Sequence, residues 1–202
     1  MPYYANLHRQ FITRRYEPWC NIRVCVMLLL IGSLMTGCGQ QVLDYGFAIK
    51  DVSIIPGYQT LNIHLTQDLA LSEQAREALE HGVTLTIRLD LELRNDNDIV
   101  RVTRAARRFE IRYLPLSERF QLSTVESGDL QAFPRLRHVL AAINELNVQL
   151  PTGALPPGGY ELRTRVWLDK SRLPTPMQLP AWFSSQWQHD SEWSVWPVKI
   201  GV

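Results

Sequence analysis

The chain has 202 residues, a length that suits one domain with additional segments. Hydrophobic residues make up 46% and charged residues 20%, a composition that excludes a disordered chain. The formal charge of +1 gives no case for a nucleic-acid partner.

The N-terminus departs from this average composition. Residues 1–23 carry four arginines and one acid, and residues 24–35 (VCVMLLLIGSLM) carry no charge. Twelve residues are too few to cross a bilayer as a helix, which takes about 20. A basic segment followed by a short apolar core is typical of a secretory signal.

The apolar core ends in LMTGC, with Cys38 last. This resembles the bacterial lipobox, whose cysteine receives a diacylglycerol and becomes the mature N-terminus. We therefore predict a lipoprotein-type signal peptide over residues 1–37, lipidation of Cys38, a tether over 38–45 and a single β-rich domain over 46–202. An ordinary cleaved signal peptide and an uncleaved anchor are the alternatives.

These segments predict a lipid-anchored protein on the periplasmic face of a bacterial membrane, with a soluble periplasmic protein as the alternative. Gly39 is not aspartate, which favours the outer membrane by the enterobacterial sorting rule. Cys20 and Cys25 precede the cleavage point, so the mature chain has no cysteine to pair with Cys38. Removing the leader's four basic residues and one acid from totals of 21 and 20 leaves a mature charge of −2.

The mature chain begins with two predicted strands, residues 47–55 and 58–65, which form a hairpin around Pro56-Gly57. Residues 71–82 (LSEQAREALEHG) predict a helix with Ser72 as its N-cap. This helix leads into residues 83–94, the longest strand pattern of the chain.

Residues 83–94 read VTLTIRLDLELR, with apolar side chains at odd positions and polar ones at even positions. The alternation predicts a central strand about 40 Å long with one buried face and one wet face. On the wet face, Asp90 and Glu92 could serve as an acid–base pair. A solvated surface with arginine partners, such as Arg88 and Arg94, is the favoured interpretation.

The remaining elements alternate between strands and turns. Residues 99–114 are extended, a return strand begins at Phe120, and a short strand covers 130–133. Residues 134–146 predict a second helix, 150–159 a loop, 160–168 a strand and 173–180 a proline-rich segment before the last strand. We predict a mainly β protein, an antiparallel β-sandwich of immunoglobulin-like character with two short helices in crossovers. A mixed α+β sheet is the alternative.

The order of these segments resembles the DUF4390 family of exported proteobacterial proteins over about residues 46–198. The resemblance is carried by FAIKDVSI, LSEQAREALEHGVTLTIRLDLELR, RRFEIRYLPLSERFQLST, FPRLRHVLAAINEL and the final SEWSVWP. It implies a signal-bearing periplasmic protein of unknown function, linked to a membrane sensor kinase of the nitrogen-regulation type. It implies no catalytic residue.

Candidate catalytic groups are sparse in the sequence. The segment His189 to Glu192 (HDSE) is a second candidate beside Asp90 and Glu92, but neighbouring strand residues point to opposite faces, so a turn is favoured. No spacing suggests a metal or a cofactor, and we predict neither. The basic run from Arg101 to Arg112 could hold an anionic partner, although a solvated face paired with acids is favoured.

The tryptophans give the best functional hint. Tryptophan is favoured both in cores and at binding surfaces. We predict a non-catalytic module that binds an envelope protein, with a small-ligand or lipid-binding protein as the alternative and an unrecognised hydrolase third. The predicted interaction surface comprises Trp182, Trp187, Trp193 and Trp196.

Overall fold

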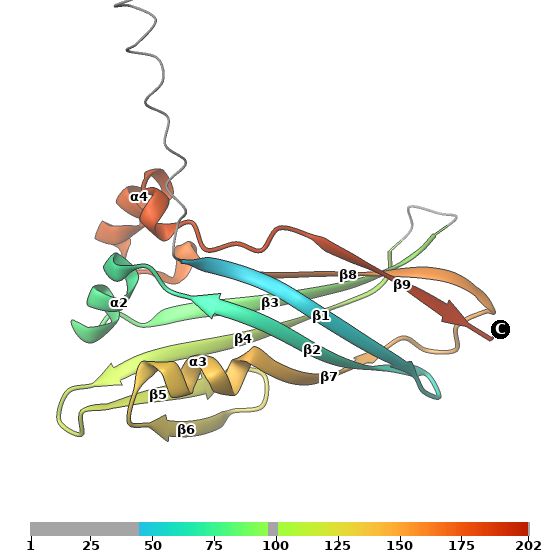
Figure 1. Ribbon diagram of the computed structural model, residues 1–202, viewed down its shortest axis with the longest axis horizontal. Helices are drawn as coiled ribbons and strands as arrows, with labels where there is room; N and C mark the ends of the chain where they lie inside the picture. Colours follow the sequence, from blue (N-terminus) through green and yellow to red (C-terminus); the bar gives the residue numbers. More distant parts are fainter. Residues whose placement is uncertain (1–44, 97–100, 202) are drawn as a thin grey trace, which may run out of the picture. The chain divides into compact units, whose positions relative to one another are not determined.

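A computed structural model describes residues 45–96 and 101–201 (Figure 1). The predicted signal peptide, Cys38 and nearly all of the tether lie outside these residues. None of the helices in the described ranges is long and apolar enough to cross a membrane.

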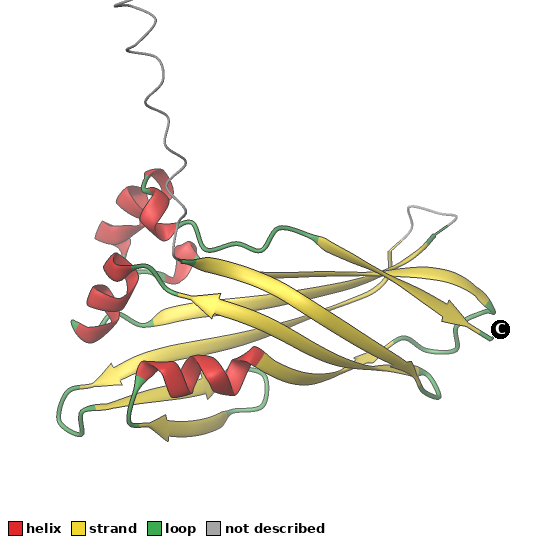
Figure 2. Cartoon of the chain, viewed as in Figure 1, coloured by secondary structure: helices red, strands yellow, loops and turns green. Residues whose placement is uncertain are grey.

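The described residues form two antiparallel sheets (Figure 2). Both sheets contribute buried apolar side chains to one core, which confirms the predicted mainly β, sandwich-like fold. The three-stranded sheet has the order β1 (Gly46–Pro56), β2 (Thr60–Ala70) and β7 (Glu145–Pro151). The six-stranded sheet has the order β6 (Asp129–Phe133), β5 (Arg119–Thr124), β4 (Arg101–Leu114), β3 (Leu85–Asn95), β8 (Gly158–Leu168) and β9 (Ser194–Ile200).

Strand β3 is the central strand that its sequence pattern predicts. It pairs with β4 on one side and with β8 on the other. Its odd-numbered side chains point into the core, and all are fully buried: Leu85, Ile87, Leu89, Leu91 and Leu93. This inner face carries the apolar burial that stabilises the domain.

Two helices lie where the sequence predicts them. Helix α2 (Glu73–Glu80) begins at Ser72, whose hydroxyl accepts the Ala75 N–H. It ends before Gly82, whose φ of 88° suits glycine. Helix α3 (Leu136–Asn144) buries Val139 and Ile143 in the core.

Two elements were not predicted. Strand β7 occupies residues that we assigned to the end of a helix and a loop, because the helical pattern of α3 runs on to Leu146 and hides the alternation of Leu146, Val148 and Leu150. Helix α4 (Thr175–Phe183) replaces the predicted proline-rich segment. Pro174 and Pro176 stand at its start, where a helix tolerates proline, whereas Pro180 lies inside it. Two short 3-10 turns, η1 (Lys170–Arg172) and η2 (Ser185–Trp187), flank α4.

Candidate interaction surfaces

The outer face of β3 is buried, contrary to the solvated surface that the sequence predicts. Asp90 is 3% exposed and Glu92 is 4% exposed. The alternation of β3 places both carboxylates away from the apolar core, as expected. The prediction failed because long side chains from β4 and β8, which the pattern of one strand cannot place, close over them.

Asp90 is held by groups from all three central strands. Its Oδ1 accepts from Arg88 Nε at 2.9 Å and from Arg104 Nη2 at 3.4 Å, while its Oδ2 accepts from Trp167 Nε1 at 2.9 Å. A buried carboxylate without such partners would be strongly unfavourable, so these bonds make its burial possible.

Glu92 has a similar shell of arginines. Arg94 Nη2 donates to Oε2 at 3.0 Å, and Oε1 lies 3.7 Å from Arg101 Nη2 and 3.9 Å from Arg104 Nε. Arg104 therefore links the two carboxylates. The arginine side chains remain 24–51% exposed, so their outer parts reach solvent while the carboxylates do not.

The arginines beside this network lie against tryptophan rings. The guanidinium carbons of Arg88 and Arg165 lie 5.5 and 5.6 Å from the centre of Trp167, and those of Arg163 and Arg165 lie 5.1 and 6.0 Å from the centre of Trp193. These distances fit cation–π interactions. We call these residues, with Asp90 and Glu92 beneath them, the arginine–tryptophan face.

Asp190 fixes one of these arginines. Arg165 donates from Nε to Asp190 Oδ1 at 2.8 Å, and its Nη2 bonds Oδ2. The hydrogen bond to Asp190 raises the pKa of Arg165. A bidentate pair of this kind fixes the orientation of the guanidinium plane. Asp190 thus belongs to the arginine–tryptophan face, where its carboxylate binds Arg165.

Positive charge predominates on the outer face of β3, β4 and β8. The strand register places eight arginines there against four carboxylates. The arginines are Arg88, Arg94, Arg101, Arg104, Arg108, Arg112, Arg163 and Arg165, and the carboxylates are Asp90, Glu92, Glu110 and Glu161. Much of the predicted basic run therefore lies on this face. Its arginines pair with acids, which is the interpretation that the sequence favoured: for example, Arg108 Nε lies 2.9 Å from Glu126 Oε1.

The structure separates the four tryptophans of the predicted interaction surface. Trp193 lies on the arginine–tryptophan face, whereas Trp196 points inward from β9 and donates to Thr164 Oγ1 at 3.0 Å. Trp187 is buried, at 3% exposure, and Trp182 is 54% exposed on α4. Sequence reasoning missed Trp167 as a site residue, and the alternation of β8 was the available signal.

A pocket adjoins the arginine–tryptophan face. It has a volume of about 410 Å³. Lys170 lies at its edge, with Nζ 4.7 Å from the centre of the Trp182 ring. The aromatic side chains of the lining come from three different elements, β8, α4 and η2: Trp167, Trp182 and Trp187. The lining of the pocket therefore combines tryptophan rings with the cationic side chains of Arg165 and Lys170.

His189 packs inside the domain at 2% exposure, against the rings of Tyr45 and Phe47. Its Nε2 accepts the backbone N–H of Ser72 at 2.9 Å, so the neutral ring carries its hydrogen on Nδ1. Burial lowers the pKa of His189 to about 4, against a smaller raising effect of the Trp187 carbonyl.

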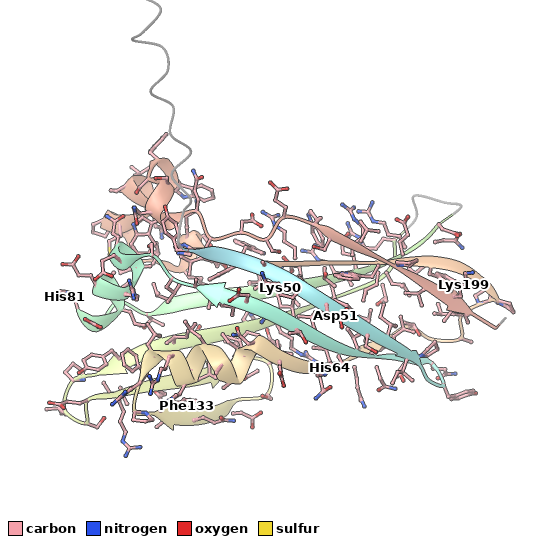
Figure 3. All side chains as sticks on the ribbon, in the orientation of Figure 1. Lys50, Asp51, His64, His81, Phe133 and Lys199 are labelled. Atoms are coloured by element: carbon pink, nitrogen blue, oxygen red, sulfur yellow. The ribbon has the colours of Figure 1, made fainter. Side chains whose placement is uncertain are left out.

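The hydroxyl of Ser72 does not face His189 as a nucleophile would. It donates to the Gln186 carbonyl at 2.6 Å and accepts from Ala75. His189 therefore ties the C-terminal segment to the start of α2. The three other histidines of the described residues lie on separate elements: His64 on β2 and His81 at the end of α2 (Figure 3), and His138 on α3.

Comparison with known proteins assigns the family. The model of a family described as "Domain of unknown function (DUF4390)" matches residues 45–197, and the chain belongs to this family. No curated protein and no solved structure matches the chain. The family confirms the resemblance seen in the sequence but supplies no activity.

Proposed function

We propose that this DUF4390 protein is a non-catalytic interaction module, anchored on the periplasmic side of a bacterial membrane through a lipid on Cys38. Its arginine–tryptophan face binds an acidic surface of an envelope protein. The lipobox before Cys38 supports the anchor, and the structure of the outer face of β3, β4 and β8 supports the binding role.

The observation that carries the proposal is the fixed arrangement of arginine and tryptophan over buried carboxylates. Tryptophan and arginine are the residues most enriched at the energetic centres of protein interfaces. Asp90 and Asp190 hold Arg88 and Arg165 in place before a partner arrives. Binding then costs less side-chain entropy than it would for free arginines.

The charge of the face indicates what kind of partner fits. On the outer face of β3, β4 and β8, eight arginines stand against four carboxylates, and Asp190 and Glu126 pair with two of them from neighbouring segments, although the mature chain carries a net charge of −2. Arg163 stacks on Trp193 and has no ion pair among the described residues, so its charge is available to a partner. An acidic protein surface complements these features. The sensor kinase implied by the family resemblance is one candidate partner.

Site-specific crosslinking in cells tests this proposal. A photoreactive amino acid replaces Val195, which is 50% exposed and pairs with Arg163 at the edge of the face. The matched control replaces Ile55, which is 64% exposed on the other sheet. We expect a discrete protein adduct from position 195 alone, and its loss with Arg163→Glu. Equal labelling from both positions, or an adduct that survives Arg163→Glu, would contradict the proposal.

The pocket beside the face supports a second candidate function, the binding of a small ligand or lipid. Its volume of about 410 Å³ and aromatic lining are typical of ligand sites. Native mass spectrometry of protein released gently from membranes tests this candidate. A bound small molecule that is lost in Trp182→Ala supports it, whereas an unliganded mass in both proteins counts against it.

A further inference from the structure

Helix α4 presents an apolar surface to solvent. Leu179 is 71% exposed, Trp182 54% and Phe183 86%. Residues at i, i+3 and i+4 share one side of a helix, so the three side chains form a continuous stripe. We call these three residues the α4 stripe. The opposite side of the helix packs on the domain through Ala181, which is fully buried.

The segment that carries the α4 stripe has no charged side chain of its own, and Glu77 of α2 lies across the groove lined by Met177 and Pro180. Residues 173–188 contain no charged side chain, in a chain where one residue in five is charged. The nearest charges before α4 are the cations of η1, Lys170 and Arg172. An exposed stripe of leucine, tryptophan and phenylalanine, with basic residues close by in the chain, suits the headgroup region of a bilayer.

A lipid on Cys38 would keep the start of the domain within reach of the membrane. Six residues separate Cys38 from Tyr45, so the chain between the two spans at most about 25 Å. The Tyr45 ring lies 5.3 Å from the His189 ring. His189 follows η2, and Trp187 of η2 lines a groove together with Met177 and Pro180 of α4. The start of β1 and helix α4 therefore share one end of the domain (Figure 1).

We propose that the α4 stripe inserts into the surface of the lipid bilayer that holds the Cys38 anchor. This inference rests on the lipid anchor of the proposed function. Lys170 and Arg172 lie beside the inserted helix and attract anionic headgroups. A second contact next to the anchor holds the domain in one orientation at the bilayer surface.

Depth-dependent quenching tests the insertion. The lipidated protein is purified from membranes and reconstituted in phosphatidylethanolamine–phosphatidylglycerol vesicles. Ser185→Cys carries a polarity-sensitive fluorophore next to the intact stripe, because Ser185 is exposed and Cys38 is blocked by its lipid. The control is Tyr58→Cys, which is 90% exposed in the β1–β2 hairpin. Lipids with a spin label near the headgroup serve as quenchers.

We expect quenching at position 185 to exceed that at position 58 severalfold, and to fall to the control value when Trp182→Ser and Phe183→Ser are added. Equal quenching at both positions of vesicle-bound protein would overturn the insertion and leave the anchor in place. Recovery of the protein in the soluble fraction of cells would overturn the anchor and the insertion with it. Melting curves of the labelled variants check that each is folded.

Discussion

The outer face of β3 and helix α4 distribute charge and apolar surface in opposite ways. On β3, Asp90 and Glu92 are almost inaccessible, yet each has two or more cationic partners. On α4, three large apolar side chains are exposed. The buried carboxylates are satisfied within the fold, whereas the α4 stripe is not. Asp90 and Glu92 therefore have a structural role, whereas the exposed α4 stripe is a surface that we propose contacts the bilayer.

The largest expected effect comes from a carboxylate on the wrong face of β3. Leu89 is fully buried and stands one residue before Asp90. Leu89→Asp places an unpaired charge in the apolar core, and we expect a loss of more than about 4 kcal/mol, enough to prevent folding. Circular dichroism and urea unfolding measure it. A soluble variant that melts cooperatively would show that the register of β3 is wrong.

Removal of a paired carboxylate should cost less. Asp90→Ala leaves three donors without their acceptor, and we expect a loss of about 3 kcal/mol in the free energy of unfolding. The matched control is Asp68→Ala, which removes an exposed ion pair with Lys50 and should cost less than about 1 kcal/mol. Equal losses in urea denaturation would mean that the network beneath the arginine–tryptophan face is not stabilising.

The pH dependence of stability reports on His189. Its pKa is about 4 in the folded protein, below the ordinary value of 6.5, so only the unfolded chain takes up the proton as the pH falls below 6.5. Stability is therefore complete above pH 6.5 and is lost as the pH falls towards 4.

Between pH 7.5 and pH 5 we expect the wild type to lose about 2 kcal/mol from this histidine, as measured by urea denaturation at each pH. His189→Gln has no titrating group at this position and should lose less over the same range. Parallel curves for the two proteins would contradict the assignment of His189 as a buried neutral group.

The smallest effect on stability is expected at α4. Phe183→Ser removes a side chain that is 86% exposed, so the free energy of unfolding should change by less than about 0.5 kcal/mol. Vesicle quenching should nevertheless decrease, which would separate the role of the α4 stripe from that of Asp90. A large loss of stability would instead mean that Phe183 packs on the domain.

The sequence predicted the fold better than the surfaces. Period-two alternation identified β3 and the hairpin of β1 and β2, because each strand signal is local. Helix α4 was missed because its prolines suggest a loop: Pro176 stands in the first turn, which tolerates proline, but Pro180 lies inside the helix. Strand β7 was missed because it follows α3 without a break.

The arginine–tryptophan face could not be predicted from the sequence, because its contacts join residues that are far apart in the chain. The sequence correctly indicated arginine partners for Asp90 and Glu92. Their burial depends on Arg104 and Trp167, which are 14 and 77 residues away from Asp90 in the chain. Only the pairing of β3 with β4 and β8 brings these side chains together. The sequence likewise grouped four tryptophans that the structure separates, since Trp187 is buried and Trp196 points inward.

Both proposals depend on the lipid at Cys38, so its detection is the most direct test. Cells that express the wild type or Cys38→Ala are labelled with a palmitate analogue, and the protein is then isolated from membrane and soluble fractions. We predict that the wild type is labelled and membrane-bound, and that Cys38→Ala is unlabelled and released from the membrane. An unlabelled wild type, or unchanged fractionation of Cys38→Ala, would contradict the lipid-anchored account.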